Sequence, residues 1–299
     1  MEKKLIGNRP ELNTIYEDKN GILMSVNPND KYEKDAYHVI YVNGSQEQHY
    51  TPSGKGRGLL MMGHNTWGHN CDYYSEKIIP HIQNFRVDES NDNSEQFSTS
   101  LYEGAKYLNT DKIILIGKSY GGLISLKLSD RDLIDQVVAI NPVIFGSPFA
   151  NKEMVDGHKW KKDPLTKIVK GQIYSTFNRE LYRDNQVGFT NEKARGMDLQ
   201  EINANKARIY GGSIVGLPLK MSSNIHEELA QKLAADVMYD MTGQENDSTV
   251  IWDKQALEQY GIEYTEMASP YHGNTQKSNY NRLIFHDVQK RLIKNKRGK

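Results

Sequence analysis

Short apolar segments alternate with amphipathic ones along most of the chain, and this alternation predicts its elements. Three β-rich segments bounded by Asn and Gly come first and are predicted as strands: 20–27, 36–44 and 56–65. The third is apolar throughout, which indicates burial on both faces, as in a parallel sheet. Residues 70–83 are compatible with a helix up to Pro80, and residues 84–90 follow as a short strand.

The same alternation continues through the rest of the chain. Residues 94–109 carry apolar side chains at helical spacing and are predicted as an amphipathic helix. Four more predicted strands alternate with helices before and after a less regular stretch. The predicted strands are 111–119, 136–145, 235–243 and 262–270, and the predicted helices are 121–130, 252–261 and 279–294.

Strand–helix alternation with buried strands is typical of an α/β fold with right-handed crossovers. We therefore expect a doubly wound, mostly parallel sheet. The irregular stretch is predicted to be an inserted cap or lid region at 147–233, between an N-terminal core part at 1–146 and a C-terminal core part at 234–299.

The predicted cap is rich in aromatic residues and ends in a convincing amphipathic helix at 223–236. Ser222 or Asn224 would cap that helix. Aromatic residues in an insert of this size more often form a small hydrophobic core of their own than line a ligand-binding pocket. Placed over a reactive residue, such a cap would still form an apolar pocket and exclude water.

Composition narrows the class of protein. Lys plus Arg and Asp plus Glu both total 38, so the formal net charge is zero and nothing favours nucleic acid as a partner. The single cysteine, Cys71, excludes an internal disulfide framework and a Cys-rich zinc site, and we expect no metal or other cofactor.

Mean hydropathy is low, at −0.71, and the longest apolar runs are far shorter than the about 20 residues of a membrane span. We therefore expect no integral membrane segment. The first residues contain charges but no apolar core of a signal peptide. A cytoplasmic protein is the expectation, although a mature secreted protein without its leader would look identical.

The stretch "IILIGKSYGG" at 113–122 contains GKS, the ending of a phosphate-binding loop. That loop requires a Gly five positions before Gly117, where this chain has Lys112. The residues between are a β-branched strand that cannot form the required turn. The spacing therefore disfavours a nucleotide-binding enzyme.

The alternative interpretation is a nucleophile elbow. Gly117, Ser119 and Gly121 match G-x-S-x-G between a predicted buried strand and a predicted helix. Small residues there, with Gly122, would let the strand and the helix pack closely. Ser119 would stand above the sheet at a helix N-terminus, which favours developing negative charge. A Gly-rich turn with a capping serine is the structural alternative.

A nucleophilic serine requires a base and an orienting acid, which in this architecture follow along the chain in the order Ser, acid, His. His272 lies in a Pro/Gly/Asn-rich loop after the last predicted strand and is favoured over His286, inside the last predicted helix. Asp247 is favoured as the acid because it lies on the turn that leads into the next helix. The competing acids are Glu245 and, at the margins of the loop, Asp240 and Asp253.

An oxyanion hole completes such a site. One donor would be the backbone N–H of Tyr120, directly after the serine. The second would come from the loop after the third predicted strand, from Thr66 or Asn65. His64 and His69 in that loop have no carboxylate at metal-ligand spacing.

The segments "GKSYGG", "HNTWG" and "TGQENDSTV…YHG" together resemble the α/β-hydrolase superfamily in order and separation. "HNTWG" is similar to the family's HGTWG-type oxyanion loop, with Asn65 in place of the usual Gly. "NPVIFGSPFA" at 141–150 is similar to the segment that leads into the lid of bacterial lipases. Lys118, before the serine, is less usual in the family and places a cation beside the elbow.

The resemblance and the ordered residues imply an esterase- or lipase-like serine hydrolase that acts on a small-molecule ester through an acyl-serine. Thioesters, amides and acyl transfer to another alcohol use the same residues. Lys118 and Asn65 motivate an alternative from another class, a catalytically silent binding protein on the same fold. The sequence gives no indication of the oligomeric state.

Overall fold

The structure is a computed structural model. It describes residues 14–18, 21–25, 37–42, 60–61, 94–106, 113–164, 166–171, 195–218, 225–268, 271–272, 284, 287–288 and 290, and the statements below concern these residues.

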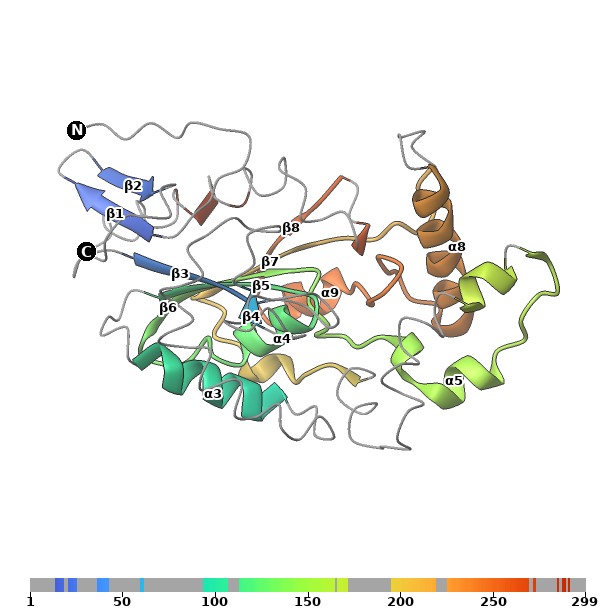
Figure 1. Ribbon diagram of the computed structural model, residues 1–299, viewed down its shortest axis with the longest axis horizontal. Coiled ribbons are helices and arrows are strands. Elements are labelled where there is room, and N and C mark those ends of the chain that lie inside the picture. Colours follow the sequence, from blue (N-terminus) through green and yellow to red (C-terminus); the bar gives the residue numbers. More distant parts are fainter. Residues whose placement is uncertain are drawn as a thin grey trace, which may run out of the picture.

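A mixed sheet forms the centre of the molecule (Figure 1). Its strands are β1 Thr14–Asp18, β2 Gly21–Ser25, β3 Tyr37–Val42, β4 Leu60–Met61, β5 Ile113–Lys118, β6 Ile134–Ile140, β7 Ala207–Gly211 and β8 Glu263–Glu266. They lie in the order β2-β1-β3-β5-β6-β7-β8, with β4 beside β3. All neighbours from β3 through β8 are parallel, whereas β1, β2 and β4 pair antiparallel. The prediction of an α/β fold with a mostly parallel sheet is confirmed.

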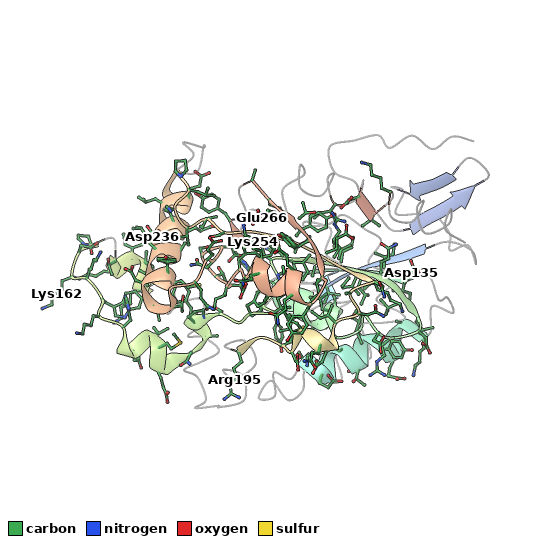
Figure 2. The ribbon with its side chains drawn as sticks, turned by 180° about the vertical axis from the view of Figure 1, so that it is seen from behind. Asp135, Lys162, Arg195, Asp236, Lys254 and Glu266 are labelled. Atoms are coloured by element: carbon green, nitrogen blue, oxygen red, sulfur yellow. The ribbon has the colours of Figure 1, made fainter. Side chains whose placement is uncertain are left out.

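Helices connect and cover these strands. The α-helices are α3 Ser94–Lys106, α4 Tyr120–Leu126, α5 Lys152–Gly157, α8 Ile225–Thr242 and α9 Lys254–Gln259, and two 3₁₀-helices are η1 Pro148–Ala150 and η2 Leu199–Glu201. The described residues of the predicted helix 279–294 are helical too. An ion pair of 3.7 Å between Lys254 and Glu266 joins α9 to β8, and Figure 2 shows both side chains. None of the described helices is both long and apolar enough to span a membrane.

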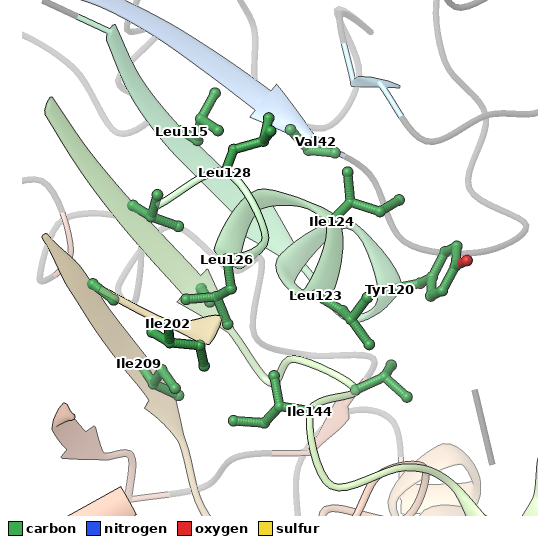
Figure 3. Close-up of a cluster of buried hydrophobic side chains, with 14 of the residues drawn as sticks. Val42, Leu115, Tyr120, Leu123, Ile124, Leu126, Leu128, Ile144, Ile202 and Ile209 are labelled. Carbon is green, nitrogen blue, oxygen red and sulfur yellow. The ribbon is translucent and has the colours of Figure 1, made fainter. Parts of the chain in front are cut away.

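The central strands are buried on both faces. Ile113 and Leu115 belong to a cluster that also holds residues of α3, α4 and α9. Figure 3 shows side chains of α4 packed against the strands in this cluster. Ile114 and Ile116 point to the opposite face, because side chains alternate along a strand, and they are fully buried as well. Two-sided burial explains why this strand is a continuous apolar run.

The predicted strand 235–243 is wrong: these residues form the C-terminal part of α8. Leu233, Val237 and Met241 follow one another at helical spacing and pack in one cluster, so the apolar face of the predicted helix 223–236 continues through them. Gly243 ends the helix with φ 68°, and its N–H donates to the carbonyl of Tyr239.

The sequence analysis missed two of the described strands, β1 and β7. β7 lies between β6 and β8 although its residues fall within 147–233. It has only five residues and contains a charged one, Arg208. Arg208 donates to Thr265 at 2.9 Å and pairs with Asp287 at 3.0 Å and with Glu263. Its charge is therefore compensated by groups that are distant in sequence, which local patterning does not reveal.

The predicted strand 56–65 is represented in the described residues by β4 alone, whose two residues pair antiparallel to β3. The expectation of a parallel pairing there is wrong. The predicted helix at 70–83 and the predicted strand at 84–90 lie outside the described residues.

Two excursions leave the sheet and meet each other. One follows β6 and includes η1 and α5, and the other follows β7 and includes α8. Their side chains share a second apolar cluster, in which Phe149, Val155 and Val169 pack with Met238 of α8. The second excursion closes on itself, since the N–H of Ile214 donates to the carbonyl of Asn246 at 2.8 Å. The range predicted as the cap therefore includes a strand of the sheet, and the division into core and cap stays a prediction.

Candidate active site

Ser119 lies in a sharp turn between β5 and α4. Its backbone has φ 55° and ψ −123°, a left-handed conformation that is uncommon for a residue with a side chain. Backbone hydrogen bonds hold it: its N–H donates to the carbonyl of Ile140 at 2.9 Å, and its carbonyl accepts from the N–H groups of Gly122, Leu123 and Val143. This strand–turn–helix geometry is the one that presents a serine above a parallel sheet.

The glycines around the serine are required by close packing. A Cβ at Gly117 would lie 2.3 Å from the carbonyl oxygen of Gly121, and a Cβ at Gly122 would lie 2.8 Å from the Cβ of Pro142. Real Cβ atoms do not approach that closely, so a larger residue would displace the turn. The glycines therefore allow β5, α4 and the segment after β6 to meet at Ser119.

The structure brings Ser119, His272 and Asp247 together. Nε2 of His272 lies 2.9 Å from Oγ of Ser119, and Nδ1 lies 2.7 Å from Oδ2 of Asp247. A carboxylate only accepts, so Nδ1 carries the proton and Nε2 is left to accept from the serine hydroxyl. Asp247 is 1% exposed, which keeps water from its bond to the imidazole.

The loop that carries Asp247 fixes its carboxylate. Oδ1 accepts from the backbone N–H of Thr249 at 2.9 Å and of Val250 at 2.8 Å. Oδ2 thereby remains directed to His272, whose own N–H donates to the carbonyl of Asp247 at 3.3 Å. His272 and Asp247 are thus connected through both side chain and backbone.

Asn246 supports this loop, and the sequence analysis did not identify it. It is fully buried, and its Nδ2 donates to the carbonyls of Ala235 and Gln244 while its Oδ1 accepts from the N–H of Ser248. Two successive Asx residues, each able to bond to backbone two residues on, are the sequence signal that could have indicated it.

The other acidic residues that the sequence offered as partners of the histidine lie elsewhere in the structure. Asp240 and Glu245 are exposed, and Asp253 caps α9 by accepting from the N–H of Ala256 at 3.0 Å. His286, Asn65 and Thr66 lie outside the described residues.

Two neighbours of the serine complete the described part of the site. Tyr120 opens α4 with its ring fully buried, and its backbone N–H belongs to the first helical turn, whose N–H groups point out of the helix end. Lys118 is 4% exposed, so the cation beside the elbow is buried rather than solvated. Among the described residues, no group of three or more His, Cys, Asp or Glu side chains could hold a metal ion.

No protein-family model matches the sequence, and no curated protein matches it significantly. Some solved structures are similar to it at low identity. The mature form of the Bacillus licheniformis lipase BlEst2 is 17% identical, with 84% of this chain and 91% of that chain covered and a TM-score of 0.41. The enol-lactonase of Burkholderia xenovorans is 18% identical over 65% of this chain and 72% of that chain, with a TM-score of 0.32.

Esterase B of Lactobacillus rhamnosis is 12% identical over 70% of this chain and 65% of that chain, with a TM-score of 0.33. The resemblance to a known superfamily comes from the geometry of this protein itself. Ser119 follows β5, Asp247 follows β7 and α8, and His272 follows β8. In its parallel sheet, its serine turn and this order of residues, the protein resembles the α/β-hydrolase superfamily.

Proposed function

We propose that the protein is a serine hydrolase that cleaves carboxylic esters of small molecules through an acyl-serine intermediate. The observation that carries the proposal is the imidazole of His272, which lies within hydrogen-bond distance of both Ser119 Oγ and Asp247 Oδ2. A serine within reach of a base that a buried acid orients is the arrangement that activates a hydroxyl for attack on a carbonyl carbon.

In the first half of the reaction Ser119 Oγ attacks the ester carbonyl and gives its proton to Nε2 of His272. Asp247 stabilises the imidazolium that forms and does not take the proton. The N–H of Tyr120 is a donor for the oxyanion, and we assign the second donor to Thr66 or Asn65. Collapse of the tetrahedral intermediate breaks the ester C–O bond, and the leaving alcohol takes the proton from His272.

In the second half a water molecule attacks the acyl-serine and gives a proton to Nε2. The second tetrahedral intermediate collapses, the carboxylic acid leaves, and the proton returns to Ser119 Oγ. The two excursions from the sheet would form the cap that excludes other water. Esters of modest size suit such a capped site, and the cytoplasm remains the location that the sequence favours.

Replacement of the nucleophile tests the proposal. Ser119→Ala should lower the turnover of 4-nitrophenyl butyrate by roughly 10³-fold or more. Ser147→Ala is the matched control, because the Ser147 hydroxyl is buried after β6 and contacts no hydrogen-bond partner within the described ranges, so its loss should change activity little. Unchanged turnover in the Ser119 variant would contradict a role for this serine.

A fluorophosphonate probe separates the enzyme from a silent binding protein, the alternative that buried Lys118 motivates. An activated Ser119 reacts stoichiometrically with the probe, and mass spectrometry of the labelled peptide identifies the site. Folded protein that takes up no label would favour the binding protein.

A further inference from the structure

A buried carboxylate lies on α8, away from the three residues of the proposed active site. Glu228 is 6% exposed, and its Oε2 has no hydrogen-bond partner among the residues that the structure describes. Lys232, the lysine of the same helix one turn further on, donates to the carbonyl of Ile214 at 3.1 Å and pairs with Asp236 at 3.5 Å. A buried carboxylate oxygen without a donor is costly, which points to a binding partner that supplies one.

A buried phenol faces the same region. Tyr271 is 2% exposed, and its hydroxyl also lacks a hydrogen-bond partner in the described part of the chain. Its ring packs with Ile214 and with Ala235 of α8. Glu228 lies seven residues before Ala235, two turns along the same helix face, so the carboxylate and the phenol are on the same side of α8.

The electrostatics agree with this proximity. Burial and, second, the negative charge of Glu228 raise the pKa of Tyr271. The phenol therefore stays neutral and offers a lone pair beside a carboxylate. Two buried oxygens, one of them charged, match a cation that carries N–H donors better than they match a neutral or anionic group.

The position of the pair relates it to catalysis. Tyr271 directly precedes His272, whose imidazole contacts Ser119. We propose that Glu228 and Tyr271 form a binding site for a primary ammonium group of the ester substrate. One N–H of the ammonium would donate to Oε2 of Glu228 and another to the phenol oxygen. This inference rests on the proposed ester hydrolysis and narrows its substrate to esters that carry an ammonium group.

Direct binding tests the site without turnover. Calorimetry on the full-length protein would compare n-hexylammonium with 1-hexanol, which has the same chain and no charge. The wild type should bind the ammonium at least about tenfold more tightly, and Glu228→Gln should remove that preference. Asp236→Asn, the corresponding carboxylate-to-amide change at an exposed position of α8 (Figure 2), should keep it. Tyr271→Phe should weaken ammonium binding and is the second variant should the first not fold.

A pair of substrates tests the link to catalysis. The ratio of kcat/KM for 4-nitrophenyl 6-aminohexanoate over 4-nitrophenyl heptanoate should exceed one in the wild type and fall about tenfold in Glu228→Gln. Equal binding of the two probes, as expected where water alone bridges the oxygens, would overturn the site. Selective binding without a substrate preference would overturn its role in substrate recognition. Selective ammonium binding by a protein that hydrolyses no ester would contradict the proposed hydrolysis but would support the ammonium site.

Discussion

The left-handed backbone conformation of Ser119 determines where its side chain lies. A non-glycine residue in a sparsely populated backbone conformation costs about 1–3 kcal/mol. The turn persists because backbone groups of Ile140, Gly122 and Val143 bond to it and because Gly117 leaves room for α4. Any change that relaxes the turn would move Oγ away from His272.

Oδ2 of Asp247, the oxygen that contacts Nδ1 of His272, should be required for activity. Asp247→Asn keeps the volume but can place an N–H₂ group opposite Nδ1, which disfavours the imidazole tautomer that accepts from Ser119. We expect kcat to fall by roughly 10³–10⁴-fold, with the fold intact by circular dichroism.

Glu245→Gln and Asp240→Asn are the controls for that experiment, because both side chains are exposed competitors for the same role. Both should retain near wild-type activity. If either control lost as much activity as Asp247→Asn does, the assignment of Asp247 as the acid would be contradicted.

The residues of the candidate site could be named from the sequence because each stands at a fixed place relative to a predicted element. Ser119 follows a strand that is apolar without interruption, and His272 follows the last strand. Asn246 could not be named in this way, since its bonds are internal to its loop and to α8.

At the scale of elements, α8 shows where patterning misleads. Residues 235–243 have a short apolar centre that fits a strand when considered alone. In the structure Met238 is fully buried and Tyr239, beside it, is exposed, while Leu233, Val237 and Met241 share one cluster. The periodicity is helical only when the preceding turns are included.

Truncation of α8 side chains tests its packing against the excursion after β6. Met238→Ala should lower the free energy of unfolding by about 2–5 kcal/mol, because the side chain is fully buried among Phe149, Val155 and Val169. Urea denaturation measures this change.

Tyr239→Ala is the neighbouring control and should cost far less, since that side chain is 44% exposed. A larger loss for Tyr239 than for Met238 would place the other face of α8 in the protein interior and contradict this packing.

At the scale of the whole molecule, the sequence predicted the α/β class but not how the excursions divide. A single insert at 147–233 is the simplest interpretation of one irregular stretch. The sheet instead takes β7 from inside that range, because parallel pairing with β6 and β8 buries Ile209 and Tyr210. Long-range pairing of this kind leaves no local periodic signal in a five-residue strand.

Alkaline pH should destabilise the folded protein partly through Tyr271. Its pKa is raised in the folded state by burial and by Glu228, so the folded chain holds this proton more tightly than the unfolded chain does. The contribution to stability is fully present below the ordinary tyrosine pKa of about 10 and is lost as pH rises through the folded value.

Urea denaturation between pH 8 and 11 measures this effect. Tyr271→Phe should lose less stability than the wild type over that range, since it has no proton to release at this position. Identical losses in the two proteins would show that Tyr271 does not contribute.

The proposed active site is assembled from distant parts of the chain. The contact between Ser119 and His272 joins residues 153 positions apart, and the contact between His272 and Asp247 joins residues 25 apart. During refolding, long-range pairs form only after the loops between them have closed. Secondary structure should therefore recover before Ser119 becomes reactive. The recovery of Ser119 reactivity would then report when the C-terminal strand docks, as the last step of folding.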